Sequence, residues 1–186
     1  MNPILRVFNR FLDELEAANV PYMVMGGWAV QVWGRPRPTY DVDFTISVSD
    51  ADLRLFLQTL RAKGIIVDDA FLKGSQDHLA GFAKVQVSVF EFPDPIRVDL
   101  FLAKNDYQRA AFSRRREVNL LKRKIWVMAP EDLILHKLVA GRHKDLAAIE
   151  DILALQNGPG QLDGDYLRQW GSRLSVLDAI EKLLPA

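Results

Sequence analysis

Met23–Ile46, MVMGGWAVQVWGRPRPTYDVDFTI, is the stretch of sequence that decides the fold. A strand-like run ends at Gly26-Gly27, and an Arg-Pro loop leads into a second strand-like run that contains Asp41-Val42-Asp43. Successive side chains of a strand point to opposite faces, so the two aspartates share one face and their apolar neighbours share the other. The two carboxylates lie roughly 6.6 Å apart along the strand, close enough to hold the same hard cation. Burying two acids on one face is costly unless a metal or a cationic group compensates, so this stretch predicts a charged functional site.

Gly26-Gly27 lies at a predicted junction between a strand and a helix. The preceding run, residues 21–25, is nearly all apolar, which is typical of a strand covered on both faces, and residues 28–33 predict a short helix. Glycine lets the backbone approach a ligand closely, and amides at a helix N-terminus favour anions such as phosphate. A simple tight turn would also explain the pair.

The remaining sequence alternates predicted helices with predicted strands. Apolar spacing predicts helices at residues 4–15, 49–63, 105–116, 130–140, 146–153, 165–171 and 175–184. It predicts strands at residues 65–67, 83–92 and 96–102, and a hairpin at residues 118–128, whereas residues 68–81 read as a loop or one helical turn. The order of these elements predicts an α+β fold, a small mixed β-sheet flanked by helices and followed by a C-terminal helical tail.

Composition excludes several classes of protein. The chain has 186 residues, 49% of them hydrophobic, enough for one domain with a sizeable core. Lys and Arg number 24, as do Asp and Glu, so no overall charge attracts nucleic acid or a membrane. The absence of cysteine fits a reducing compartment, and the sequence shows neither a signal peptide nor a membrane-spanning run. We therefore expect a cytoplasmic protein without a membrane partner.

Four pieces of sequence in a fixed order resemble a known superfamily. They are Gly26-Gly27, the Arg-x-Arg-x-Thr-x-Asp-Val-Asp of residues 35–43, Asp99 within IRVDLF, and PEDLILHK of residues 130–137 with RHKD at 142–145. Together they resemble the DNA polymerase β-type nucleotidyltransferases, and most of all the minimal bacterial nucleotidyltransferases related to the AbiEii abortive-infection toxins. The resemblance spans most of the chain from residue 20 to about 155.

The resemblance implies a nucleotidyltransferase core at residues 1–128 and a helical subdomain at residues 129–186. It implies transfer of a nucleoside monophosphate from a nucleoside triphosphate (NTP) to a hydroxyl on RNA, a protein or a small molecule. Asp41 and Asp43 would hold one Mg²⁺ on the triphosphate, and with Asp99 a second Mg²⁺, the two ions being about 3.5–4 Å apart. Asp99 would accept the proton of the acceptor hydroxyl. The alternative to a shared metal site is that these are three unrelated surface aspartates.

The resemblance also implies a set of nucleotide-binding residues. Gly26 and Gly27 would cradle the triphosphate through backbone amides, although the family often has a serine at the second position. Arg35, Arg37 and Thr39 precede the acidic pair, and one arginine would reach the phosphates or the acceptor while the other neutralises the acids. Lys137 would face the nucleotide, unless it lies on a solvated helix face.

Two other features bear on function. The three histidines are scattered without ligand spacing, which predicts structural roles and no zinc site. A basic patch at residues 114–116 and 122–124 could meet RNA or could be a solvated hairpin. The resemblance implies the toxin of a toxin–antitoxin or phage-defence pair with a cognate antitoxin, or equally a housekeeping or orphan enzyme. The alternative is a module of the same fold that binds nucleotide or an antitoxin without catalysis.

Overall fold

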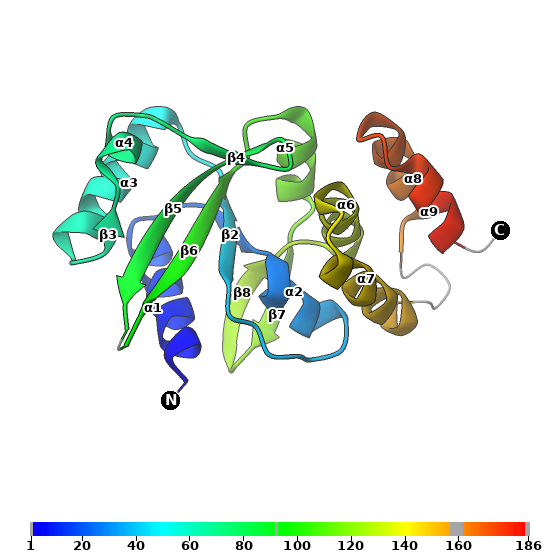
Figure 1. Cartoon of the computed structure of the whole chain (residues 1–186), viewed down its shortest axis with the longest axis horizontal. Helices are drawn as coiled ribbons and strands as arrows, with labels where there is room; N and C mark the ends of the chain where they lie inside the picture. Colours follow the sequence, from blue (N-terminus) through cyan, green and yellow to red (C-terminus); the bar gives the residue numbers. More distant parts are fainter. Residues whose placement is uncertain (1, 92, 157–161, 185–186) are drawn as a thin grey trace.

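A mixed eight-stranded β-sheet flanked by helices forms the centre of the molecule (Figure 1). The structure is a computed structural model that describes residues 2–91, 93–156 and 162–184. The strand order is β3-β5-β6-β2-β1-β8-β7, with β4 paired to β5. The strands are β1 (Tyr22–Val24), β2 (Val42–Ile46), β3 (Ile66–Val67), β4 (Asp77–Leu79), β5 (Phe82–Phe90), β6 (Pro95–Leu102), β7 (Arg116–Leu120) and β8 (Arg123–Val127). This architecture confirms the predicted α+β class.

The two central strands are fixed by their buried alternate residues. β2 runs parallel to β6 and antiparallel to β1. Asp43 is paired in register with Asp99, and the apolar residues on either side of each are fully buried. The predicted strand included Asp41, but β2 starts at Val42, so Asp41 lies just before the strand. The core therefore sets the register that aligns two of the predicted acids.

The helices lie around the sheet and at its two ends. Figure 1 shows α3 and α4 at one end of the sheet and α6 to α9 at the other. In α1, Asn2 accepts a hydrogen bond from the Ile4 amide at the first turn, and the ring of Phe8 stacks on that of Trp28 at 4.1 Å. The helices are α1 (Pro3–Ala17), α2 (Gly26–Trp33), α3 (Asp50–Ala62), α4 (Asp69–Leu72), α5 (Asp106–Ser113), α6 (Pro130–Ala140), α7 (His143–Leu155), α8 (Gly164–Arg173) and α9 (Leu177–Leu183).

Residues 68–81 differ from the prediction of a loop or one helical turn. The helical turn is present as α4, but Asp77–Leu79 forms the strand β4, which pairs antiparallel with the start of β5. All three residues of β4 are exposed, so the sequence lacks the apolar alternation that identifies a strand. Ala80 and Gly81 make the turn, both with positive φ. This hairpin places Leu79 and Phe82 beside the predicted site.

The C-terminal helices join the core through α6, and α7 also contacts α2. α6 contacts α2, α7 and α8, and Leu167, Trp170 and Ile180 of the last two helices are buried. The boundary at residue 128 stays a prediction. Within the described ranges, no helix combines the length and the apolar composition needed to cross a membrane.

Candidate active site

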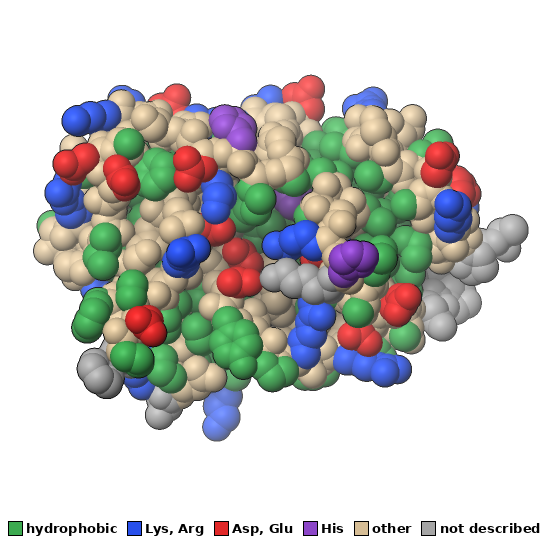
Figure 2. Space-filling model, viewed as in Figure 1, with side chains coloured by type: hydrophobic (Ala, Val, Ile, Leu, Met, Phe, Trp, Pro, Cys, Tyr) green, Lys and Arg blue, Asp and Glu red, His purple; other side chains and the backbone are tan. Residues whose placement is uncertain are grey.

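A cavity of about 490 Å³ opens beside the ends of β2 and β6. Its walls come from three segments that are far apart in the sequence, within residues 25–43, 79–101 and 133–145. In Figure 2 acidic and basic side chains gather around a hollow near the middle of the visible face. The residues predicted from the sequence that line the cavity are Gly26, Gly27, Arg37, Thr39, Asp41, Asp43, Asp99 and Lys137.

Arg35 is the predicted site residue that does not line this cavity. Its Nε lies 3.5 Å from Oδ1 of Asp151 on α7, and its side chain is largely exposed. The Arg-Pro loop thus directs Arg37 into the cavity and Arg35 toward α7.

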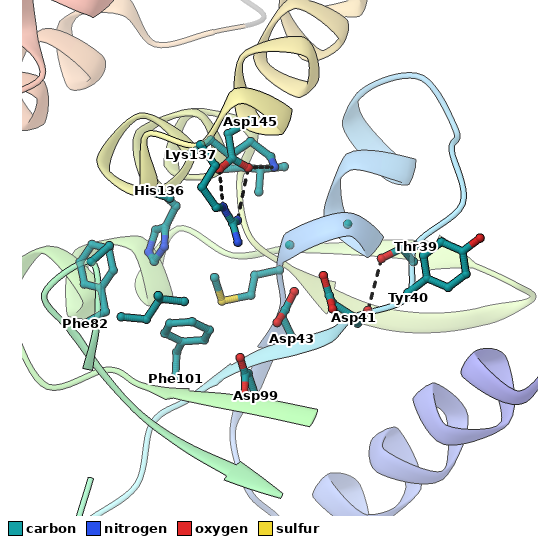
Figure 3. Close-up of a pocket in the computed structure, with 18 of the residues that line it drawn as sticks. Thr39, Tyr40, Asp41, Asp43, Phe82, Asp99, Phe101, His136, Lys137 and Asp145 are labelled. Atoms are coloured by element: carbon teal, nitrogen blue, oxygen red, sulfur yellow. Dashed lines mark hydrogen bonds and ion pairs between the residues drawn. The ribbon is translucent and has the colours of Figure 1, made fainter. Parts of the chain in front are cut away.

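Asp43 and Asp99 are neighbours across the parallel pair β2–β6, and Asp41 immediately precedes β2 (Figure 3). Burial, followed by the negative charges of Asp99 and Asp41, raises the pKa of Asp43 to about 7. The positive charges of Arg142 and Lys84 act in the opposite direction. Burial is therefore the main reason why the pKa of this carboxyl at the start of β2 is near 7, and the two neighbouring acids add to the shift.

Lys84 on β5 is paired with Asp99, and the sequence analysis did not identify it. The Lys84 Nζ lies 2.7 Å from Asp99 Oδ2, with the two side chains 13% and 20% exposed. The other carboxylate oxygen, Oδ1, is buried and has no hydrogen-bond partner. The signal was present, since Lys84 belongs to the polar set that alternates with Val85, Val87 and Val89 along β5.

The glycine pair allows two close approaches. α2 begins at Gly26, whose φ is +60°, and a Cβ there would lie 2.0 Å from Oδ2 of Asp43. A Cβ on Gly27 would lie 2.3 Å from Oγ1 of Thr39, whose hydroxyl donates to the Asp41 carbonyl oxygen at 3.3 Å. The N-terminus of α2 therefore lies directly against Asp43 and against Thr39 in the loop before β2. The structure thus explains the glycines by packing as well as by backbone conformation.

Lys137 is buried, with 7% of its surface exposed, so the alternative of a solvated helix face is wrong. Its Nζ lies 3.1 Å from Oδ1 of Asp145, and Nε of Arg142 lies 2.7 Å from Oδ2 of the same carboxylate. Burial lowers the pKa of Lys137, with Asp145 opposing the shift and Arg37 adding to it. Gly141, at φ +62°, ends α6 so that α7 returns Asp145 to this position.

One part of the cavity wall is apolar and was not predicted. Phe82, Phe101, Leu79 and Leu133 contribute to it, together with His136. The His136 ring stacks on Phe82 with centroids 4.4 Å apart. Burial, and then the charge of Lys137, lowers the pKa of His136 to about 3, so the ring is neutral. The sequence predicted a structural histidine, and nothing in the local pattern distinguishes these wall residues from ordinary core residues.

The donor set fits a hard divalent cation. In the part of the chain that the structure describes, no three His, Cys, Asp or Glu side chains converge as a ready-made metal site. However, Oδ1 of Asp99 is buried without a hydrogen-bond partner, and the charges of Asp99 and Asp41 add to the burial that raises the pKa of Asp43. Mg²⁺ is usually held by one or two carboxylates together with substrate phosphates, an arrangement these oxygens can support once a triphosphate is bound.

Comparisons with known proteins find similar solved structures but no similar sequence family. No protein-family model and no curated protein sequence matches the chain. A solved structure of an antigenic nucleotidyltransferase-like protein from Paracoccidioides brasiliensis superposes with a TM-score of 0.54 at 18% identity, covering 96% of this chain and 91% of that one. The antibiotic-resistance factor ANT(2″)-Ia gives a TM-score of 0.58 at 14% identity, covering 95% and 96%. The lincosamide antibiotic adenylyltransferase LnuA gives 0.53 at 17% identity, covering 78% and 94%. The chain therefore has the fold of the nucleotidyltransferases.

Proposed function

We propose that this protein is a Mg²⁺-dependent nucleotidyltransferase that transfers a nucleoside monophosphate from an NTP to a hydroxyl acceptor. The observation that carries the proposal is the register of β2 and β6, which sets Asp43 beside Asp99 in a cavity that also contains the N-terminus of α2. The fold shared with nucleotidyltransferases supports the same reaction class.

The predicted residues on the polar side of the cavity have the following roles in this proposal, and Thr39 packs against Gly27 at the start of α2. The amides of Gly26 and Gly27 bind the triphosphate, and Arg37 and Lys137 add positive charge beside it. Arg35 would contact the nucleotide only if its ion pair with Asp151 were broken. Asp41, Asp43 and Asp99 would hold two Mg²⁺ ions, which would supply neutralisation of the negative charge that develops in the reaction.

The transfer itself is a displacement at phosphorus. The acceptor oxygen bonds to the α-phosphorus, the bond from that phosphorus to the bridging oxygen breaks, and pyrophosphate leaves with the bond electrons. Asp99 accepts the hydroxyl proton, for which its buried, unpartnered Oδ1 provides an acceptor.

The acceptor and the biological role are further parts of the proposal. ANT(2″)-Ia has been solved in complex with adenylyl-2″-tobramycin, and LnuA with lincomycin bound, which favours a small molecule over RNA or a protein as acceptor. The resemblance to AbiEii-type proteins supports a toxin of a toxin–antitoxin or phage-defence system, acting in the cytoplasm with a cognate antitoxin.

The test is incubation of the purified protein with Mg²⁺, each α-labelled NTP and a cell extract that supplies acceptors. We expect label to enter an acceptor with release of pyrophosphate. Asp43→Asn and Asp99→Asn should each lower the rate by about 100-fold or more. Asp106→Asn, at an exposed position on α5 outside the cavity lining, is the control and should keep the rate. Full activity in Asp43→Asn, or transfer in the presence of EDTA, would contradict the proposal.

A second candidate function is a module that binds nucleotide without turning it over. The ion pair from Lys84 to Asp99 favours it, because the ammonium takes one of the oxygens that a metal ion would use. Position 27 also has no serine hydroxyl to donate to a phosphate. Calorimetric binding of a nonhydrolysable NTP, without pyrophosphate release from the natural NTP in the presence of extract, would favour this module.

A further inference from the structure

The cavity has two chemically different halves, one on either side of Asp43 and Asp99. In Figure 3, Thr39, Tyr40 and Asp41 lie on one side of Asp43 and Asp99, and Phe82, Phe101 and His136 lie on the other. The first half contains the α2 N-terminus and Arg37, which suit a triphosphate. The second half is next to Asp99 and is therefore left for the acceptor.

The acceptor half is built as an apolar platform. Phe82 and Phe101 come from the adjacent strands β5 and β6, and Leu79 reaches the cavity from the β4–β5 hairpin. Phe82 and Phe101 are 4% and 5% exposed and Leu79 is 42% exposed, so a ring or an alkyl group would contact the small exposed part of each phenylalanine together with Leu79. The His136 Nε2 is buried in this wall without a hydrogen-bond partner, so one polar group of a ligand could satisfy it.

The charges around this half do not suit a polycation. Asp145 is paired with Lys137 and Arg142, and Asp99 is paired with Lys84. The wall formed by Phe82, Phe101 and Leu79 contains no carboxylate, so an acceptor ammonium placed over Phe82 would lose its hydration there. The nearest acid, Asp99, is paired with Lys84 through Oδ2, and its Oδ1 is used by the proposed reaction. An uncharged acceptor avoids this cost.

The basic patch predicted at residues 114–116 and 122–124 does not suit an RNA strand. The predicted basic patch is largely neutralised by acids of the same chain. The ion pairs are those of Arg114 with Glu131 and Asp132, Arg116 with Glu131, Arg123 with Asp13 and Glu16, and Lys124 with Glu117. Arg115 instead stacks on the rings of Phe112 and Trp126. Phosphates along this hairpin would have to displace carboxylates.

We propose that the acceptor is a small, uncharged hydroxyl compound with an aromatic or other apolar group, which packs on Phe82, Phe101 and Leu79 and places its hydroxyl at Asp99. This proposal rests on the proposed function and names its substrate class.

The experiment uses three probes with similar hydroxyl groups and the full-length protein. Phenyl β-D-glucopyranoside, methyl β-D-glucopyranoside and D-glucosamine are titrated and followed by saturation-transfer NMR in the presence of Mg²⁺ and a nonhydrolysable ATP analogue. We expect the phenyl compound to bind about 10-fold or more tightly than the methyl compound, because only the former buries an aromatic ring. D-glucosamine should show no saturation transfer above background.

Two variants test whether the phenyl compound binds to the apolar platform. Leu79→Asp puts a charge at a position that is 42% exposed, where the fold should tolerate it, and Phe82→Leu keeps an apolar side chain without the ring. Both should remove the preference for the phenyl compound. Phe90→Ala is the matched control, a phenylalanine at the other end of β5 that is 64% exposed and outside the cavity lining, and it should keep the preference.

The outcomes separate this proposal from the proposed function. Calorimetry with the ATP analogue alone tests the nucleotide half, and failure there counts against the proposed function. Nucleotide binding together with equal affinity for the phenyl and methyl compounds, absence of phenyl binding, or a phenyl preference that survives in Leu79→Asp would overturn the acceptor proposal. A mobility shift of a 20-nucleotide RNA that Leu79→Asp abolishes would also overturn it, in favour of RNA.

Discussion

Two structural features require glycine at position 26. Its φ of +60° is in the left-handed region that side chains rarely adopt, and its missing Cβ leaves room for the Asp43 carboxylate. The sequence predicted a glycine at a strand-to-helix junction, and that much is confirmed by the start of α2. The contact with Asp43 could not be predicted, because it depends on how β1 and β2 pair.

Gly26→Ala should therefore cost more than the backbone strain alone. Strain at positive φ costs about 1–2 kcal/mol, and the clash with Asp43 adds to it. Gly64→Ala is the control, because Gly64 has a φ of +79° and nothing within 4 Å of its added Cβ. Chemical denaturation should show a larger loss of unfolding free energy for Gly26→Ala than for Gly64→Ala, and calorimetry should show weaker nucleotide binding only for the former. Equal effects of the two variants would show that the contact with Asp43 is unimportant.

Lys84 compensates the charge of Asp99 within the chain itself. The pair is mostly buried, so removing the ammonium leaves a carboxylate with little hydration beside Asp43. A divalent cation then becomes the main source of compensation.

Lys84→Met should lower the free energy of unfolding by about 1–3 kcal/mol in EDTA, and Mg²⁺ should raise the melting temperature of the variant more than that of the wild type. Lys104→Met removes a more exposed ion pair with Asp50 and should change stability by less than about 1 kcal/mol. Differential scanning fluorimetry with and without Mg²⁺ measures both effects. A variant as stable as the wild type in EDTA would argue against this role of Lys84.

At the scale of elements, α6 connects the cavity with the C-terminal helices. Its middle supplies Leu133, His136 and Lys137 to the cavity, and its first turn buries Glu131 and Asp132. The sequence predicted the helix and its proline start, and both are confirmed. It did not predict that acids of the first turn are buried, because their partners come from α8 and from residues 114–116, distant in the sequence.

The environment of Asp132 makes stability depend on pH. The Tyr166 hydroxyl donates to Oδ1 at 2.7 Å, and Arg114 Nε lies 3.6 Å from Oδ2, with Glu131 and Arg116 nearby. Burial outweighs the hydrogen bond and the arginines and raises the pKa of Asp132 from 3.8 to about 7. The folded state therefore keeps a proton that the unfolded state has lost, so this contribution to stability is present at low pH and disappears as the pH rises toward 7.

Asp132→Asn imitates the protonated carboxyl and should remove this dependence. At pH 3, below the unfolded pKa of 3.8, the variant should resemble the wild type, and at pH 8 it should be more stable by about 1–4 kcal/mol. Urea unfolding at both values measures the difference. Asp43 titrates in the same window with the same sign, but it is present in both proteins and cancels in the comparison. A variant that is less stable at pH 8 than the wild type would mean that the charged carboxylate is the favoured form.

At the scale of the whole molecule, the sequence predicted what is local and periodic. It predicted the class of fold, most helices and strands, and most of the residues that line the polar half of the cavity. The strand β4 was missed because its three exposed residues lack apolar alternation. The partner of Asp99 and the apolar platform were missed because they depend on contacts between separate segments. The basic patch shows the same limit, since a run of arginines reads as a site for polyanions until its acidic partners are placed.

The parallel pairing of β2 with β6 has a consequence for the tolerance of the chain to mutation. A slip of one residue would present Val98 or Leu100 where Asp99 now lies, and would turn an aspartate into the core. A chain that pairs these strands wrongly would expose apolar residues and lose stability, so the interactions that stabilise the fold also select the register that sets Asp43 beside Asp99. Insertions in the loops on either side should be absorbed, whereas a single-residue insertion within either strand should abolish folding and function together.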